Sequence, residues 1–239
     1  MDPKYLQFIK DQLEAIKKVS LGNLPKIKAP NKFYTTCYLL ENRSSMILPK
    51  GLWLEFGVFQ GTSINLMANK CPDVTLYGFD SFEGFPEDKA KEWNAKYPKD
   101  FSLQGNLPSV RKNVKLIKGW FDHTLPKFLK LHPDEPVAYL HIDCDLYAST
   151  KLVLTLLRDR LRSGTIIVFD ELVHFNGFEE HEIKAWYEFV KENNIKYEWI
   201  GIKNKVLSWD EYVKKSKHLR TFKDFRRHDY QQEVALRIL

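Results

Sequence analysis

The sequence predicts a doubly wound α/β fold: a mostly parallel, seven-stranded sheet with an N-terminal helical extension. Apolar runs typical of buried strands alternate with helical patterns from residue 51 onward. This alternation produces a parallel sheet with helices on both faces. Glycine-bearing or acidic motifs follow the predicted strands, where open α/β sheets bind their ligands. We expect a helical extension over residues 1–48 and the main domain over 49–239.

The extension should contain two helices. Residues 4–18 have apolar positions at three- and four-residue steps, which indicates an amphipathic helix. These positions are Leu6, Ile9, Leu13 and Ile16. A second, short helix is predicted around residues 38–41.

The main domain should contain the seven strands. They are predicted at 51–59, 74–80, 114–119, 137–143, 165–171, 195–202 and 233–239. Helices are predicted at 64–70, 122–131, 149–161 and 179–193. The last two strands are expected to close the sheet edge as an antiparallel pair. The stretch 81–113 has no clear period, and long segments of this kind are often lids over a site.

Composition excludes several classes of protein. The net charge is +6, from 37 basic and 31 acidic residues. The basic residues are scattered without an arginine-rich run or zinc-ligand spacing, so we expect no nucleic-acid partner. A solvated surface explains the charge best, and attraction to an acidic partner is the alternative. The three cysteines, Cys37, Cys71 and Cys144, favour a reducing compartment. With no signal peptide or membrane span evident, we expect a cytoplasmic protein with no membrane contact.

The first motif is a glycine turn that ends the first predicted strand. Glycines let the backbone approach a ligand closely, and the helix that follows offers free N–H groups. The G-x-x-x-G spacing differs from the dinucleotide-binding G-x-G-x-x-G. The alternative is a turn used only for packing. We expect the cofactor to contact Glu55, Gly57, Val58, Gly61, Thr62 and Ser63.

The next two strands end in further candidates for cofactor binding. Asp80, followed by Ser81 and Phe82, stands where α/β proteins bind a ribose diol. Its alternative role is to cap the next turn. At the third strand end lie Gly119, Trp120 and Phe121. An aromatic ring there suits an adenine, and a core position for Trp120 is the alternative.

Three carboxylates follow the fourth and fifth strands. Asp143 and Asp170 should end neighbouring strands, and Glu171 comes directly after. Converging carboxylates repel one another unless a cation lies among them. Hard oxygen ligands suit Mg²⁺, Mn²⁺ or Ca²⁺. The alternative is that some of these acids cap helices, and Asp145 is the expected cap. His174 and His181 lie near the Asp170 loop, where structural roles are favoured.

Together these motifs resemble the macrocin O-methyltransferase family. They are LEFGVFQGTS, GFDSFEGFPE, KGWFDHTLP, HIDCDLYAST and IIVFDE, in that order between about residue 50 and the C-terminal VALRIL. The resemblance implies a class I methyltransferase fold that uses S-adenosylmethionine and a divalent cation, usually Mg²⁺. Family members methylate sugar hydroxyls on macrolides and related compounds, and the analogy favours a homodimer or larger assembly.

The resemblance also implies a role for each motif. Glu55, Gly57 and Gly61 would shape the methionine side of the pocket, Asp80 would hold the ribose and Trp120 would lie near the adenine. The implied metal ligands are Asp143, Asp170 and Glu171, and Asp143 is also the implied general base. Related members have a second aspartate where this chain has a glutamate, whose longer side chain shifts the geometry.

The expected function is therefore O-methylation of a hydroxyl on a sugar or glycosylated small molecule. The enzyme would position the acceptor in line with the sulfonium carbon. Segment 81–113 would close over the sugar and exclude water. The same fold leaves open a catechol-type acceptor or an amino sugar as an N-methylation substrate. A non-catalytic module that binds S-adenosylmethionine or a nucleotide is the alternative from another class.

Overall fold

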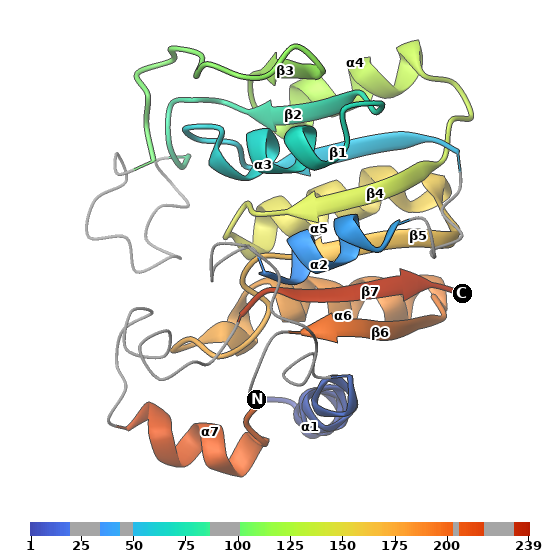
Figure 1. The fold of residues 1–239 in the computed structure, drawn as a ribbon. Helices are drawn as coiled ribbons and strands as arrows, with labels where there is room; N and C mark the ends of the chain where they lie inside the picture. Colours follow the sequence, from blue (N-terminus) through green and yellow to red (C-terminus); the bar gives the residue numbers. More distant parts are fainter. Residues whose placement is uncertain (20–33, 44–49, 87–100, 203–205, 218–231) are drawn as a thin grey trace.

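A seven-stranded sheet forms the centre of the molecule, as predicted (Figure 1). The computed structural model describes residues 1–19, 34–43, 50–86, 101–202, 206–217 and 232–239. Its strands are β1 (Leu52–Phe56), β2 (Leu76–Asp80), β3 (Val114–Lys118), β4 (Val137–Ile142), β5 (Leu161–Phe169), β6 (Tyr197–Ile202) and β7 (Val234–Ile238). The order is β3-β2-β1-β4-β5-β7-β6. Strands β1 to β5 are parallel, and β7 runs antiparallel to both β5 and β6.

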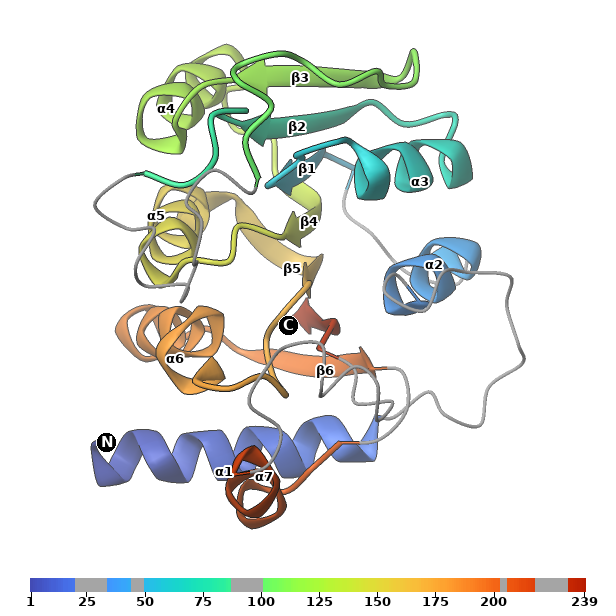
Figure 2. The same cartoon turned by 90° about the vertical axis from the view of Figure 1, so that its left-hand side faces the viewer.

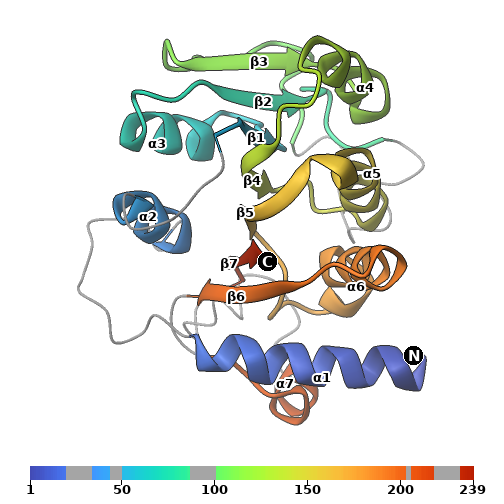
Figure 3. The same cartoon turned by 90° about the vertical axis from the view of Figure 1, so that its right-hand side faces the viewer.

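Helices cover both faces of the sheet, which makes the fold doubly wound (Figures 2 and 3). One face carries α2 (Tyr34–Glu41) and α3 (Thr62–Lys70). The other carries α4 (Phe121–Leu131), α5 (Tyr147–Leu157) and α6 (Glu182–Asn193). All five residues of β1 and all six of β4 are buried, because these central strands have helices on both sides.

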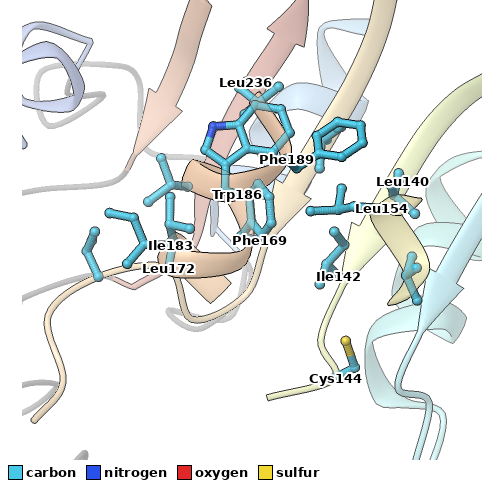
Figure 4. Close-up of a cluster of buried hydrophobic side chains, with 14 of the residues drawn as sticks. Leu140, Ile142, Cys144, Leu154, Phe169, Leu172, Ile183, Trp186, Phe189 and Leu236 are labelled. Atoms are coloured by element: carbon cyan, nitrogen blue, oxygen red, sulfur yellow. The ribbon is translucent and has the colours of Figure 1, made fainter. Parts of the chain in front are cut away.

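The larger apolar core lies between the sheet and helices α5 and α6 (Figure 4). Trp186 of α6 is fully buried there, and its ring meets Phe169 of β5 edge-on at a centroid distance of 5.7 Å. Leu154 of α5 points into the same cluster. This packing holds the carboxyl ends of β4 and β5 in fixed relation to each other.

Helix α1 (Pro3–Lys18) lies beside β6, α6 and α7 (Trp209–Ser216), at the far edge of the sheet (Figure 3). The amphipathic prediction is confirmed, except that the buried stripe begins at Tyr5 and Leu6 is only half-buried. Polar contacts reinforce the docking. The side-chain oxygen of Gln12 accepts hydrogen bonds from the Tyr197 hydroxyl at 2.8 Å and the Trp199 indole at 2.9 Å.

The sequence interpretation missed helix α7 (Trp209–Ser216), which it left as a polar stretch. The missed signal is a capping box. The Ser208 hydroxyl accepts from the Glu211 amide while the Glu211 carboxylate accepts from the Ser208 amide. The boundary predicted at 48/49 lies outside the described residues. So does the 87–100 part of the predicted lid. Among the described helices, none is long and apolar enough to cross a membrane.

Candidate functional site

The predicted motifs meet at one edge of the sheet, because parallel strands end on the same side. Backbone hydrogen bonds continue the strand pairing past the strand ends. They run from Gly57 to Phe79, from Gly119 to Asp80, from Asp143 to Phe56 and from Asp170 to Ile142, with lengths of 2.9–3.0 Å. The glycine turn, the ribose candidate and the carboxylates are therefore neighbours, as the strand order requires.

The glycine turn brings two backbone segments into close contact. Gly57 has φ +91°, a region that L side chains rarely adopt. A Cβ atom there would lie 1.7 Å from the carbonyl oxygen of Asp143. Gly61, with φ +80°, is the N-cap of α3. The first glycine is thus required for packing against the Asp143 loop, and the turn aims the start of α3 at the edge.

Asp80 joins the first two turns of the edge. Its carboxylate accepts hydrogen bonds from the backbone N–H groups of Val58 and Phe59, each at 2.8 Å, and of Phe82 at 2.7 Å. The turn-capping role considered for Asp80 is therefore present. Ser81 is also engaged locally, because its hydroxyl accepts from the Glu83 amide at 3.1 Å.

The other predicted cofactor residues differ in their exposure to solvent. The side chains of Val58 and Phe82 are buried in the core on the α3 side of the sheet. Thr62 is exposed at the first turn of α3. Trp120 is the N-cap of α4 and is 36% exposed, so the alternative of a core tryptophan is wrong. Phe121 is half-buried, edge-on to Phe56 at 5.2 Å.

The three predicted carboxylates converge. Oxygen atoms of Asp143, Asp170 and Glu171 lie within 4.8 Å of one another. Asp170 and Glu171 are buried, whereas Asp143 is half-buried and is the member nearest to solvent. The donor set consists of hard oxygens only, so these residues fit Mg²⁺, Mn²⁺ or Ca²⁺. Glu171 reaches the cluster despite its longer side chain.

Glu55 lies beneath this edge. Its side chain is fully buried, and one oxygen accepts from the Ser63 hydroxyl and lies 3.2 Å from Nδ1 of His141. Burial acts to lower the pKa of His141. The hydrogen bond to Glu55 and the charges of Glu55, Asp143 and Asp170 outweigh it and raise the pKa to about 9. Glu55 therefore forms hydrogen bonds with both Ser63 and His141, under the glycine turn.

Comparison with known protein families identifies the kind of domain to which this edge of the sheet belongs. Residues 54–172 match the family profile described as "Methyltransferase domain". The chain contains a methyltransferase domain. This domain includes the glycine turn and all three carboxylates.

Two relatives of the methyltransferase domain are named as O-methyltransferases. The chain is 31% identical over 140 residues to mycinamicin III 3''-O-methyltransferase of Micromonospora griseorubida, covering 49% of this chain and 54% of that protein. It is 29% identical over 138 residues to demethyldecarbamoylnovobiocin O-methyltransferase of Streptomyces niveus, covering 49% and 51%. The matches thus span about half the length of these relatives. Over that part, the resemblance predicted from the motifs is confirmed.

A solved structure shares the fold of the methyltransferase domain and its flanking elements. The calicheamicin methyltransferase CalS11 superposes with a TM-score of 0.58 at 20% identity, covering 99% of this chain and 94% of the other. The class I fold predicted from the sequence is therefore confirmed.

A further buried acid near this edge was missed by the sequence interpretation. Glu182, the first residue of α6, is 1% exposed. Neither of its oxygens meets a donor with hydrogen-bond geometry in the described residues. Burial and the charges of Asp145, Asp143 and Asp170 raise its pKa well above the usual range. No sequence period distinguishes Glu182 from a first-turn acid on the surface.

The structure also places three other residues of these loops. The N-cap of α5 is Leu146, whose side chain makes no capping hydrogen bond, so Asp145 does not occupy the N-cap position expected for it. The structural role favoured for His174 is confirmed: its imidazole accepts from the Leu207 amide at 3.0 Å, and the side chain is fully buried. His181 is buried at the N-cap of α6.

Proposed function

We propose that this protein transfers the methyl group of S-adenosylmethionine to a hydroxyl group of a sugar or glycosylated small molecule. The observation that carries the proposal is the convergence of Asp143, Asp170 and Glu171 beside the Gly57 turn. The glycine turn would bind the methyl donor, and the acid cluster at the same edge would bind the hydroxyl group that accepts the methyl group. The two relatives, whose names describe O-methyl transfer to natural products, support this acceptor class.

The cofactor would lie along the carboxyl ends of β1, β2 and β3. In this proposal the turn from Gly57 to Gly61 flanks the methionine part, and the start of α3 faces its carboxylate. Asp80 accepts from the ribose hydroxyls with the lone pairs that its three backbone bonds leave free. Trp120, exposed at the third strand end, covers the adenine.

Asp143 is the proposed general base. It is the accessible member of the carboxylate cluster, and its backbone is fixed against Gly57. As the acceptor oxygen attacks the sulfonium methyl group, the hydroxyl proton passes to Asp143 and S-adenosylhomocysteine leaves. A divalent cation on Asp143, Asp170 and Glu171 would supply the Lewis acidity that makes the hydroxyl easier to deprotonate. Asp170 and Glu171 orient the acceptor beside the donor.

We further propose that the protein is cytoplasmic, forms a homodimer or larger assembly and binds no nucleic acid. The three free cysteines are all buried, which supports a compartment where thiols stay reduced.

The proposal is tested by calorimetry with the purified protein. S-Adenosylmethionine and S-adenosylhomocysteine are titrated in the presence of Mg²⁺ and again with EDTA. Micromolar binding, with Mg²⁺ raising the melting temperature, is the expected result. Binding of neither ligand under either condition would overturn the methyltransferase assignment. Turnover that is insensitive to EDTA would favour an amino acceptor over a hydroxyl.

A further inference from the structure

A second cluster of metal-ligand side chains lies deeper than the carboxylates of the proposed acceptor site. It consists of His141, Asp170 and Glu233, whose donor atoms lie within 4.8 Å of one another. All three residues are at most 2% exposed. His141 is the penultimate residue of β4, Asp170 follows β5, and Glu233 precedes β7. The insertion of β7 beside β5 brings Glu233 next to Asp170, since Val234 pairs with Phe169.

The imidazole of His141 is oriented as in metal-binding sites. Its Nδ1 lies 3.2 Å from an oxygen of Glu55, which in turn accepts from the Ser63 hydroxyl. Its Nε2 is buried and makes no hydrogen bond within the described residues. Metal-ligating histidines usually donate one ring N–H to a carboxylate, which leaves the other nitrogen to coordinate. The cluster therefore has an oriented nitrogen donor as well as acids.

Glu233 is also held in place from behind. Its two carboxylate oxygens accept from the backbone N–H groups of Thr35 at 2.7 Å and Thr36 at 3.2 Å, in the first turn of α2. Each oxygen keeps lone pairs for a further partner. Since ligating carboxylates in proteins are themselves hydrogen-bonded, this arrangement matches the outer shell of a cation site.

We propose that His141, Asp170 and Glu233 form a second cation site, which shares Asp170 with the Asp143–Asp170–Glu171 cluster. One nitrogen and two carboxylate donors select a first-row transition ion such as Mn²⁺, Co²⁺ or Zn²⁺ over Mg²⁺ or Ca²⁺. The proposal is independent of methyl transfer, because it concerns binding of the ion alone. The alternative is that Nε2 binds a proton instead of a metal ion. The imidazole would then be protonated on both nitrogens, and its positive charge would replace that of the metal ion.

Cobalt binding distinguishes the two occupants. The full-length protein is stripped with EDTA, dialysed and titrated with Co²⁺, with heat and visible d–d absorption recorded together. The wild type should bind two ions. H141Q should bind one, and D143N should keep the ion of the histidine site because Asp143 is not one of the three proposed ligands of that site, although its carboxylate also lies near His141. E55Q should bind at the histidine site about 10–100-fold more weakly.

The chain offers a matched control. His132 also pairs through Nδ1 with a glutamate, Glu135 at 2.9 Å, but this pair is at the surface. H132Q should therefore bind Co²⁺ like the wild type. Equal stoichiometry in the wild type and H141Q would overturn the proposal. If H141Q does not fold, ¹⁵N NMR of the wild-type imidazole decides. A His141 that stays protonated on both nitrogens after Zn²⁺ addition sinks the site, and a Zn²⁺-shifted Nε2 supports it.

Discussion

The backbone of Gly57 lies so close to that of Asp143 that a Cβ atom on residue 57 would fall 1.7 Å from the Asp143 carbonyl oxygen. This contact joins the proposed cofactor turn to the proposed general base. G57A should therefore lose about 2–5 kcal/mol of unfolding free energy, from a strained φ and from overpacking. Chemical denaturation measures the loss.

Gly177 provides the control for G57A. It also has a positive φ, +83°, but a Cβ atom there would have nothing within 4 Å. G177A should lose only the backbone strain, about 1–2 kcal/mol. Equal losses in the two variants would show that the contact with Asp143 is unimportant.

Asp80 should be required for cofactor binding. D80N replaces one carboxylate oxygen with an NH₂ group. This donor cannot accept hydrogen bonds from the backbone N–H groups that join the first two turns through Asp80. Affinity for S-adenosylhomocysteine, measured by calorimetry, should fall at least about tenfold. D73N is the matched control, because Asp73 is an exposed partner of Arg43 far from the edge motifs. Unchanged affinity in D80N would contradict its proposed role.

Asp143 should be required for chemistry more than for cofactor binding. D143N should lower the rate of methyl transfer about 10²–10⁴-fold, the usual contribution of a general base. Its affinity for S-adenosylhomocysteine should stay within a few-fold of the wild type. Asp145 is in the same loop but outside the carboxylate cluster, so D145N should keep most of the rate. Full turnover by D143N would remove Asp143 from the mechanism.

Gln12 should stabilise the docking of α1 on the sheet. Q12L leaves the Tyr197 hydroxyl and the Trp199 indole without their shared acceptor. Leaving buried donors unsatisfied costs about 1–3 kcal/mol each. Q7L is the control, because Gln7 makes an exposed hydrogen bond to Asp11 on the same helix. Thermal unfolding that is equally affected by both changes would contradict this account.

Glu233 should make stability depend on pH. Burial and the charge of Asp170 raise its pKa to about 7 in the folded chain, against 4.5 for an ordinary glutamate. The folded state then holds a proton that the unfolded state has lost, so this contribution is present below pH 4.5 and disappears as the pH rises through 7. E233Q lacks it. In EDTA, the stability of E233Q relative to the wild type should therefore rise between pH 4.5 and 7, by up to about 3 kcal/mol. A flat difference would contradict the raised pKa.

The strands and the edge motifs could be predicted from the sequence because each depends on local signals. Apolar runs predicted every strand. Because neighbouring parallel strands end at the same edge of the sheet, the sequence also predicted that Asp143 lies beside Asp170. Helix α7 was predictable too, from the Ser208 and Glu211 spacing. The pairing of Glu55 with His141 could not be predicted from the sequence, because it depends on the register between β1 and β4.

The environments of two other acids were also beyond the sequence. Glu233 comes near Asp170 only because β7 inserts between β5 and β6, whereas the sequence predicted a simple antiparallel pair at the edge. Glu182 is a first-turn acid like many on protein surfaces. Its burial arises from the way the Glu171 loop and the start of α6 fold together, which is a tertiary effect.

The position of β7 has a consequence for how the chain folds during synthesis. A ribosome that has translated residues up to Ile202 has made every strand except the one that connects β6 to β5. Until β7 emerges, β6 has no strand of the described sheet to pair with, and the hydrogen-bonding edge of β5 stays open. Vectorial synthesis therefore leaves the β5 edge exposed to aggregation until β7 emerges, and a chaperone that shields β5 at this stage would raise the yield of folded protein.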